Sequence, residues 1–285
     1  FRAGERHLLT WGAGYRWIND DVESVTGSPL TFDPVSRNDR VLSAFIQDEI
    51  TLTGDLNLVL GAKVEDNDYT GWEVQPTVRG VWSPTSTSTT WAAVSRAVRT
   101  PSRLESDVSI VTRPVVVSGD PDAVSEEMTA YEIGLRIRPT ATLSIDLATF
   151  YNVYDNLQTF ELSGPPGPPP VMLQFGGLME GDSYGMELVT NWDVTRDWRL
   201  KAAYTWLEVD LATKSGSTDT TSAELSDRSP RHQFNIRSLF DLYDDVELDM
   251  SLYYVDSLPN SDISSYTRFD VRLGNAQKVF LYMPY

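Results

Sequence analysis

The sequence predicts an all-β protein, an antiparallel up-and-down transmembrane β-barrel fragment with about twelve long strands. Three observations predict it. Apolar residues recur at every second position, the residues between them are often charged, and short connections alternate with long ones. Helical periodicity is scarce along the chain. A barrel strand needs only about 9–11 residues with every second one apolar, so a long apolar run is not required.

The alternation begins near the N-terminal end, where Trp11, Ala13 and Tyr15 are separated by Gly12 and Gly14. It then recurs to the C-terminal end. The predicted strands are 9–17, 40–52, 56–65, 72–79, 90–98, 129–138, 143–153, 183–192, 199–208, 231–242, 246–254 and 266–273. These strands are much longer than the usual length of about 5–6 residues in soluble sheets.

The residues between the apolar positions are rich in charge, which indicates a face that meets water or a wet lumen. They include Lys63, Glu65, Glu73, Arg79, Arg136, Arg138, Asp146, Glu187, Lys201, Arg237, Glu247, Asp249, Arg268, Asp270 and Arg272. The opposite face is continuously apolar. We therefore expect that face to contact lipid.

Connection lengths favour a membrane barrel over a large soluble β-sandwich, the alternative that composition alone leaves open. Short turns are expected at 53–55, 83–85, 139–141, 195–197 and 243–245, and longer connections at 18–38, 99–125, 155–182, 210–229 and 256–264. Only the short outer connection 66–70 breaks the rule. Membrane barrels have short periplasmic turns and long outer loops.

Tryptophan placement agrees with this prediction, because Trp settles at the membrane–water interface. Seven of the eight Trp residues fall near predicted strand ends, and Trp11 is the exception. The expected interface residues are Trp17, Trp72, Trp82, Trp91, Trp192, Trp198 and Trp206.

Composition excludes several other classes of protein. A formal charge of −18 argues against a nucleic-acid binder, because phosphate backbones would be repelled. The absence of Cys excludes disulfides and thiolate metal sites, and two His residues make a His-rich metal centre improbable. No apolar run exceeds five residues, so a spanning helix of about 20 is excluded.

No cluster indicates catalysis, since the paired carboxylates lie in predicted loops without a neighbouring base; we predict no enzyme and no cofactor. The best metal candidate is the run Glu65–Asp68. It lacks the Gly and the spaced final Glu of a calcium loop, so a simple hairpin turn is favoured and no metal site is predicted.

Candidate ligand-binding residues lie at the expected outer rim. Arg96, Arg99 and Arg103 suit an anionic substrate or a lipopolysaccharide phosphate. A structural role, in which the first two pair with lumen carboxylates and fix the strand exit, is the simpler interpretation and is favoured. Tyr154, Phe160 and Tyr184 are placed to contact an organic ligand, or to serve as belt residues. The loop 164–170 holds five Pro and is expected to be a stiff spacer.

Several segments together resemble TonB-dependent outer-membrane receptors, from about Trp11 to Gly274. The matching stretches are Ala44–Glu49, Leu58–Glu65, Gly71–Pro76, Ser95–Ser102, Tyr131–Arg136, Phe150–Leu157, Gly185–Leu188 and Tyr266–Gly274. Ser95–Ser102 reads SRAVRTPS, which is similar to the strand exit of that family.

This resemblance implies a 22-stranded barrel in the bacterial outer membrane, filled by an N-terminal plug domain. It implies import of a scarce nutrient such as siderophore iron, cobalamin or a glycan, with the plug and TonB as partners and outer-membrane lipid and lipopolysaccharide around it. We expect residues 1–274 to be the middle and late barrel, without the plug, and 275–285 to be an off-pattern tail left by truncation or a frameshift.

Two other functions remain open at this stage. One is a stand-alone outer-membrane barrel for binding or adhesion, whose acidic loops hold cations or a host surface. The other is an outer-membrane enzyme with a site at the barrel rim.

Overall fold

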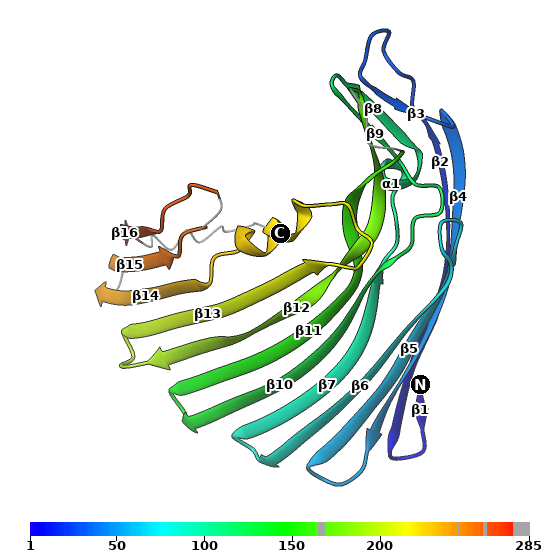
Figure 1. Ribbon diagram of the computed structural model, residues 1–285. Coiled ribbons are helices and arrows are strands. Elements are labelled where there is room, and N and C mark those ends of the chain that lie inside the picture. The colour runs from blue at the N-terminus through cyan, green and yellow to red at the C-terminus, as the bar shows by residue number, and fades with distance from the viewer. Residues whose placement is uncertain (165–168, 244–245, 259–260, 276–285) are drawn as a thin grey trace, which may run out of the picture.

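The computed structural model describes residues 1–285 except 165–168, 244–245, 259–260 and 276–285 (Figure 1). The proline-rich stretch, the turn expected at 243–245 and the C-terminal tail therefore lie wholly or partly outside the described residues. One antiparallel sheet accounts for almost the whole chain, and each long strand pairs with its neighbours in chain order.

Twelve long strands build this sheet, as the alternation predicts. They are β2 (His7–Asp21), β4 (Ser36–Thr51), β5 (Leu56–Asn67), β6 (Gly71–Thr85), β7 (Ser88–Arg99), β10 (Glu126–Thr140), β11 (Leu143–Leu162), β12 (Val171–Asp193), β13 (Trp198–Thr213), β14 (His232–Tyr243), β15 (Val246–Val255) and β16 (Tyr266–Asn275). They contain 10 to 23 residues each. The two-residue β1 (Arg2–Ala3) pairs with the start of β2.

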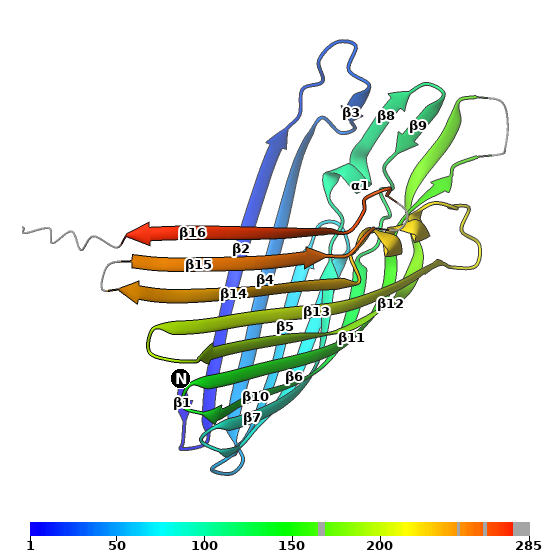
Figure 2. The ribbon, with the colours of Figure 1, turned by 90° about the vertical axis from the view of Figure 1, so that its left-hand side faces the viewer.

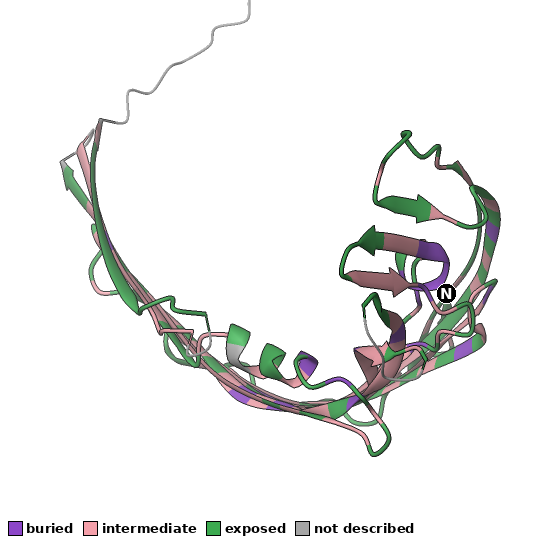
Figure 3. Ribbon diagram, turned by 45° about the horizontal axis from the view of Figure 1, so that its top comes forward, coloured by how far each residue is buried: buried purple, intermediate pink, exposed green. Residues whose placement is uncertain are grey.

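The period of two gives the sheet two chemically different faces, because paired residues project to the same side. Ile133 pairs with Ala92 and Thr149, whereas its neighbour Glu132 pairs with Ala93 and Phe150 on the other side. Viewed from above, the sheet is an open arc with the short outer elements inside it (Figure 3). The apolar residues therefore cover the convex face, where Trp11 and Leu273 are 71% and 72% exposed.

The strands are staggered along the sheet. Asp48 lies near the short-turn end of β4, and following its paired partners strand by strand leads to Glu208, in the outer half of β13. The intervening partners are Leu60, Val78, Val94, Tyr131, Tyr151 and Tyr184. This shear is what tilted barrel strands require. The arc stays open between β2 and β16 (Figure 2).

One ladder of the sheet is incomplete. β6 and β7 pair from Thr85 and Ser88 only as far as Thr77 and Ser95, although both strands continue beyond that pair. The next residue of β6 is Pro76, which has no N–H to donate. The upper part of this seam therefore lacks backbone pairing.

The connections alternate in length as predicted, with short turns at 52–55, 86–87, 141–142 and 194–197. The turn expected at 83–85 lies at 86–87 instead, because β6 continues to Thr85. At the opposite edge, the turn after β5 is short as well. Asn67 accepts hydrogen bonds from the backbone N–H groups of Tyr69 and Thr70 through its side-chain oxygen, and Gly71 takes a φ of 73°. The turn is therefore at 68–70, and residues 65–67 belong to β5 rather than to the hairpin turn that the sequence predicts at 65–68. The described residues contain no group of three or more potential metal ligands.

The long outer connections contain structure that the sequence pattern did not predict. They hold β3 (Leu30–Phe32), the helix α1 (Arg103–Asp107), β8 (Val108–Thr112), β9 (Val115–Ser118) and the 3₁₀ helix η1 (Ser222–Arg228). β3 pairs with β8, β8 with β9, and β9 runs parallel to the start of β12. Three loops distant in sequence are thus joined by one small sheet. Among the described residues, no helix is long and apolar enough to cross a membrane.

Candidate functional site

The three predicted arginines all lie at the outer edge of the arc, and each meets carboxylates. Arg96 forms an ion pair with Glu127 at 2.8 Å, and its guanidinium also donates to the backbone oxygen of Val74. The latter contact spans the unpaired upper seam between β6 and β7. Arg96 therefore has a structural task, as the simpler of the two sequence interpretations expects.

Arg99 lies between two carboxylates and joins α1 to the sheet. Its Nη2 is 2.6 Å from Glu105 and 2.7 Å from Glu126. Burial alone would raise the pKa of Glu105, but Arg99 and the N–H and hydroxyl of Ser102 outweigh it and hold that pKa below its ordinary value. Glu105 therefore stays ionised and fixes the start of α1 through a capping box with Ser102.

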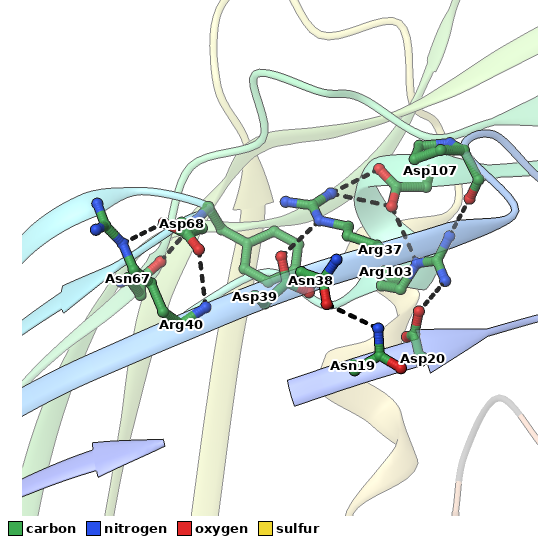
Figure 4. Close-up of polar contacts among 12 residues, drawn as sticks. Asn19, Asp20, Arg37, Asn38, Asp39, Arg40, Asn67, Asp68, Arg103 and Asp107 are labelled. Carbon is green, nitrogen blue, oxygen red and sulfur yellow. Dashed lines mark hydrogen bonds and ion pairs between the residues drawn. The ribbon is translucent and has the colours of Figure 1, made fainter. Parts of the chain in front are cut away.

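Arg103 belongs to a buried cluster at the base of the small outer sheet (Figure 4). It pairs with Asp20 at the end of β2 and with Asp107, which also accepts hydrogen bonds from Arg37 at 2.8 and 3.0 Å. Asp107 is only 9% exposed. Two guanidinium groups share this carboxylate, so α1 is tied to β2 and β4 by charge-assisted bonds.

Beside this cluster lies a groove of about 600 Å³ on the concave face, across β2, β4 and β5. Its wall includes Arg16, Lys63, Glu65, Asn67, Tyr69 and Arg103. Lys63 is paired with Glu65 at 2.7 Å, and the hydroxyl of Tyr69 donates to Asp39 at 3.0 Å. Burial, and then this hydrogen bond, raise the pKa of Tyr69 above its ordinary value, so its hydroxyl stays protonated.

Arg16 is the exception in this groove, because no ion pair or side-chain hydrogen bond joins it to another described residue. It lies on the concave face, next to Tyr15 of the convex face, and its side chain is exposed. An unpaired guanidinium in a polar groove offers five N–H donors to an anion or a carbonyl-rich ligand. Sequence analysis missed Arg16, although it is the only cation between 7 and 36.

The three predicted aromatic ligand contacts lie in different environments. Tyr154 is on the concave side, 3.0 Å from the hydroxyl of Ser183. Phe160 packs on Phe175 with ring centroids 4.9 Å apart. Tyr184 is on the convex face in a row of rings with Tyr131, Tyr151 and Trp206. This position favours the belt interpretation for Tyr184.

Six of the seven predicted interface tryptophans lie on the convex face by strand register, namely Trp17, Trp72, Trp82, Trp192, Trp198 and Trp206. Trp206 lies in the middle of β13 rather than near its end, because β13 extends to Thr213. Trp91 differs, since it lies on the concave face with Arg79 4.9 Å from its ring centroid. This placement does not match the predicted position at the lipid interface. The neighbouring residue Ala92 faces the convex side, so Trp91 must face the concave side.

The connection between β13 and β14 is fastened to the outer end of β11 by two carboxylates. Glu161 accepts bonds from Ser217 and Thr218, and Asp219 accepts one from the backbone N–H of Phe160. Burial opposes ionisation of Asp219, but Ser222 and three backbone N–H groups outweigh it and keep the pKa of Asp219 far below its ordinary value. These contacts, like the others at the outer edge of the sheet, join residues that are remote in sequence.

A broad antiparallel sheet with an apolar convex face, a charged concave face and elaborate loops at one edge is the wall of a membrane-spanning β-barrel. The family model described as TonB dependent receptor-like, beta-barrel matches residues 1–280. The chain belongs to this family, as the sequence motifs indicate. The comparison with curated proteins found no match.

Solved structures share the fold. The siderophore receptor PirA from Acinetobacter baumannii is 15% identical, with a TM-score of 0.74 over 96% of this chain and 46% of its own. A mutant of the ferric enterobactin receptor PfeA from Pseudomonas aeruginosa, in complex with enterobactin, is 16% identical, with a TM-score of 0.75 over 98% and 45%. The FrpB iron transporter from Neisseria meningitidis is 12% identical, with a TM-score of 0.70 over 95% and 45%. The chain thus spans less than half the length of each.

Proposed function

We propose that this chain forms part of the barrel wall of an outer-membrane, TonB-dependent receptor that imports a scarce nutrient and performs no chemistry of its own. Lipid and lipopolysaccharide would surround its convex face, and a plug domain would fill its concave side. TonB would supply the energy through that plug. The family match and the two-faced sheet support this function.

We infer that the nutrient is an anionic metal chelate, bound at the outer groove. Arg16 carries this part of the proposal, because its guanidinium is without an ion-pair partner among the described residues while the neighbouring cations Lys63 and Arg103 have theirs. Several solved structures with the same fold are named as siderophore receptors. Cobalamin and neutral glycans carry less negative charge than such a chelate, so they would interact less strongly with the guanidinium of Arg16.

The test uses the full-length receptor with radioactive iron-loaded enterobactin as the probe. Loss of one charge-assisted hydrogen bond costs about 1.5–3 kcal/mol, so Arg16→Gln should weaken binding roughly 10- to 100-fold. Arg136→Gln is the matched control, because Arg136 lies on β10 near the short-turn edge, outside this groove, and pairs with Asp146. Equal affinity for both variants would reject the groove as the binding site.

Transport is tested separately. Uptake of the labelled chelate should stop when TonB is uncoupled, while binding at the cell surface should persist. Uptake that continues without TonB would contradict the energised mechanism whatever the ligand proves to be.

A further inference from the structure

Two cations lie directly opposite each other on the concave face, near its short-turn edge. Lys201 of β13 and Arg237 of β14 are cross-strand partners in the register, and both side chains are exposed. Among the cross-strand pairs of the described residues, this is the only one that joins two cations. Like charges in this arrangement destabilise a sheet.

The wall around this pair does not compensate its charge. The adjoining partners are neutral, Asn191 beside Lys201 and Ser251 beside Arg237. Two of the acidic residues nearby have their own cations, since Asp249 is 2.7 Å from Arg272 and Asp270 is 2.8 Å from Arg268. A third, Asp193, lies diagonally across from Lys201 and forms no ion pair with it. Within the part of the chain that the structure describes, no ion pair includes Lys201 or Arg237. In a chain of net charge −18, such an isolated pair is unusual.

We propose that the Lys201–Arg237 pair is a docking point for a carboxylate of the polypeptide that fills the lumen. One Asp or Glu placed between the two side chains would accept hydrogen bonds from both and remove their mutual repulsion. The position suits this partner, because the pair faces the concave side near the short turns, whereas β3, α1, β8 and β9 lie at the opposite edge (Figure 2). More than half of each solved relative lies outside the part matched by this chain, so polypeptide of sufficient length exists in such proteins.

This inference rests on the proposed function for the presence of a plug, but it identifies the wall residues that hold that plug. It differs from the groove at Arg16, which lies at the opposite edge of the sheet and faces the outer loops. A passing anionic nutrient could neutralise the same pair, and the experiment separates that occupant from a protein carboxylate.

The experiment is zero-length cross-linking of the full-length receptor with a carbodiimide, which joins a Lys amine to a carboxylate in direct contact. Peptides are then identified by mass spectrometry. We expect Lys201 to be linked to an Asp or Glu outside residues 1–285. Lys201→Arg should abolish this link, because arginine keeps the charge but does not couple.

Two controls keep the result decisive. Lys63 should be linked only to Glu65, its neighbour at 2.7 Å, which shows that the sheet is intact. In Arg237→Glu, Lys201 should be linked to the carboxylate introduced on β14, which shows that the amine is reactive. Absence of a link in the unaltered receptor, together with a strong link in Arg237→Glu, would overturn the proposal and leave a free anion as the occupant.

The outcome is independent of transport. A receptor that imports iron chelates without this link rejects only the docking point. A receptor that shows the link but fails to import any chelate rejects only the proposed nutrient uptake.

Discussion

Arg37 donates from a single nitrogen, Nη1, to both carboxylate oxygens of Asp107, although the two residues are 70 positions apart in sequence (Figure 4). Arg37 also bonds Asp39 and covers the ring of Tyr69 at 4.2 Å. This contact connects the helix at the mouth to the wall. It therefore controls how firmly the small sheet of outer loops is held.

Asp107→Asn should loosen that small sheet. Removing one partner of a buried ion pair costs about 3–5 kcal/mol, because the remaining charge is left without compensation. Hydrogen exchange at β3 and β8 should accelerate roughly 100-fold or more. Asp68→Asn is the control, since Arg40 of its pair is 64% exposed and such surface pairs contribute about 0–1 kcal/mol. Equal protection in both variants would contradict the role of Asp107.

Acid should break the contacts that Asp219 and Glu105 make in the outer segments only below the pH range in which carboxyl groups ordinarily titrate. Folding lowers the pKa of Asp219 and of Glu105 from unfolded values of 3.8 and 4.5. A lowered pKa means that the stabilisation is complete above the unfolded value and is lost as the pH falls below it. A nitroxide at Thr220→Cys, in a chain without other cysteines, should stay immobile from pH 7 to about 5 and become mobile in stronger acid.

The same spin label tests the residue directly. With Asp219→Asn added, the label should already be mobile at pH 7, because the amide replaces an ionised acceptor of several bonds. An immobile label in that variant would show that other contacts hold the segment.

Charge should be tolerated on only one face of the sheet. Ile133→Arg places a guanidinium on the convex face, where a cation near the bilayer midplane costs about 2–4 kcal/mol. Val189→Arg is the matched control. Val189 lies on the charged concave face, and its side chain is 40% exposed. Guanidinium unfolding in phospholipid vesicles should show a lower midpoint for the first variant only. Similar midpoints would contradict the assignment of the faces.

Gly134 should be needed for the position of Trp91. A Cβ at Gly134 would lie 2.3 Å from the indole of Trp91, so Gly134→Ala must displace that ring from Arg79. The resonance of Trp91 in fluorotryptophan NMR should shift, with Trp91→Phe providing its assignment. Gly80→Ala is the control, because nothing lies within 4 Å of its added Cβ.

The long strands were predictable because alternation is local, and Leu42, Ala44 and Ile46 suffice to mark a face. The small outer sheet was not, because β3, β8 and β9 are short and gain their pairing from distant loops. Val115, Val116 and Val117 were the available signal, since three β-branched residues together favour a strand.

The candidate site was predictable only in part. The arginines at the strand exit were identifiable by motif, and their carboxylate partners Glu126 and Glu127 were visible in sequence but not assignable to them. Arg16 and Lys201 were not recognised as special, because a residue that lacks a partner looks in sequence like any other cation on a wet face.

The incomplete ladder beside Pro76 has a mechanical consequence. Load on a sheet is shared among its backbone bonds. Above Thr77 and Ser95 that load falls on the side chain of Arg96, which donates to the backbone oxygen of Val74 and lies 3.8 Å from Glu73. If a force is applied to the concave side of the sheet, the outer parts of β6 and β7 should therefore separate first.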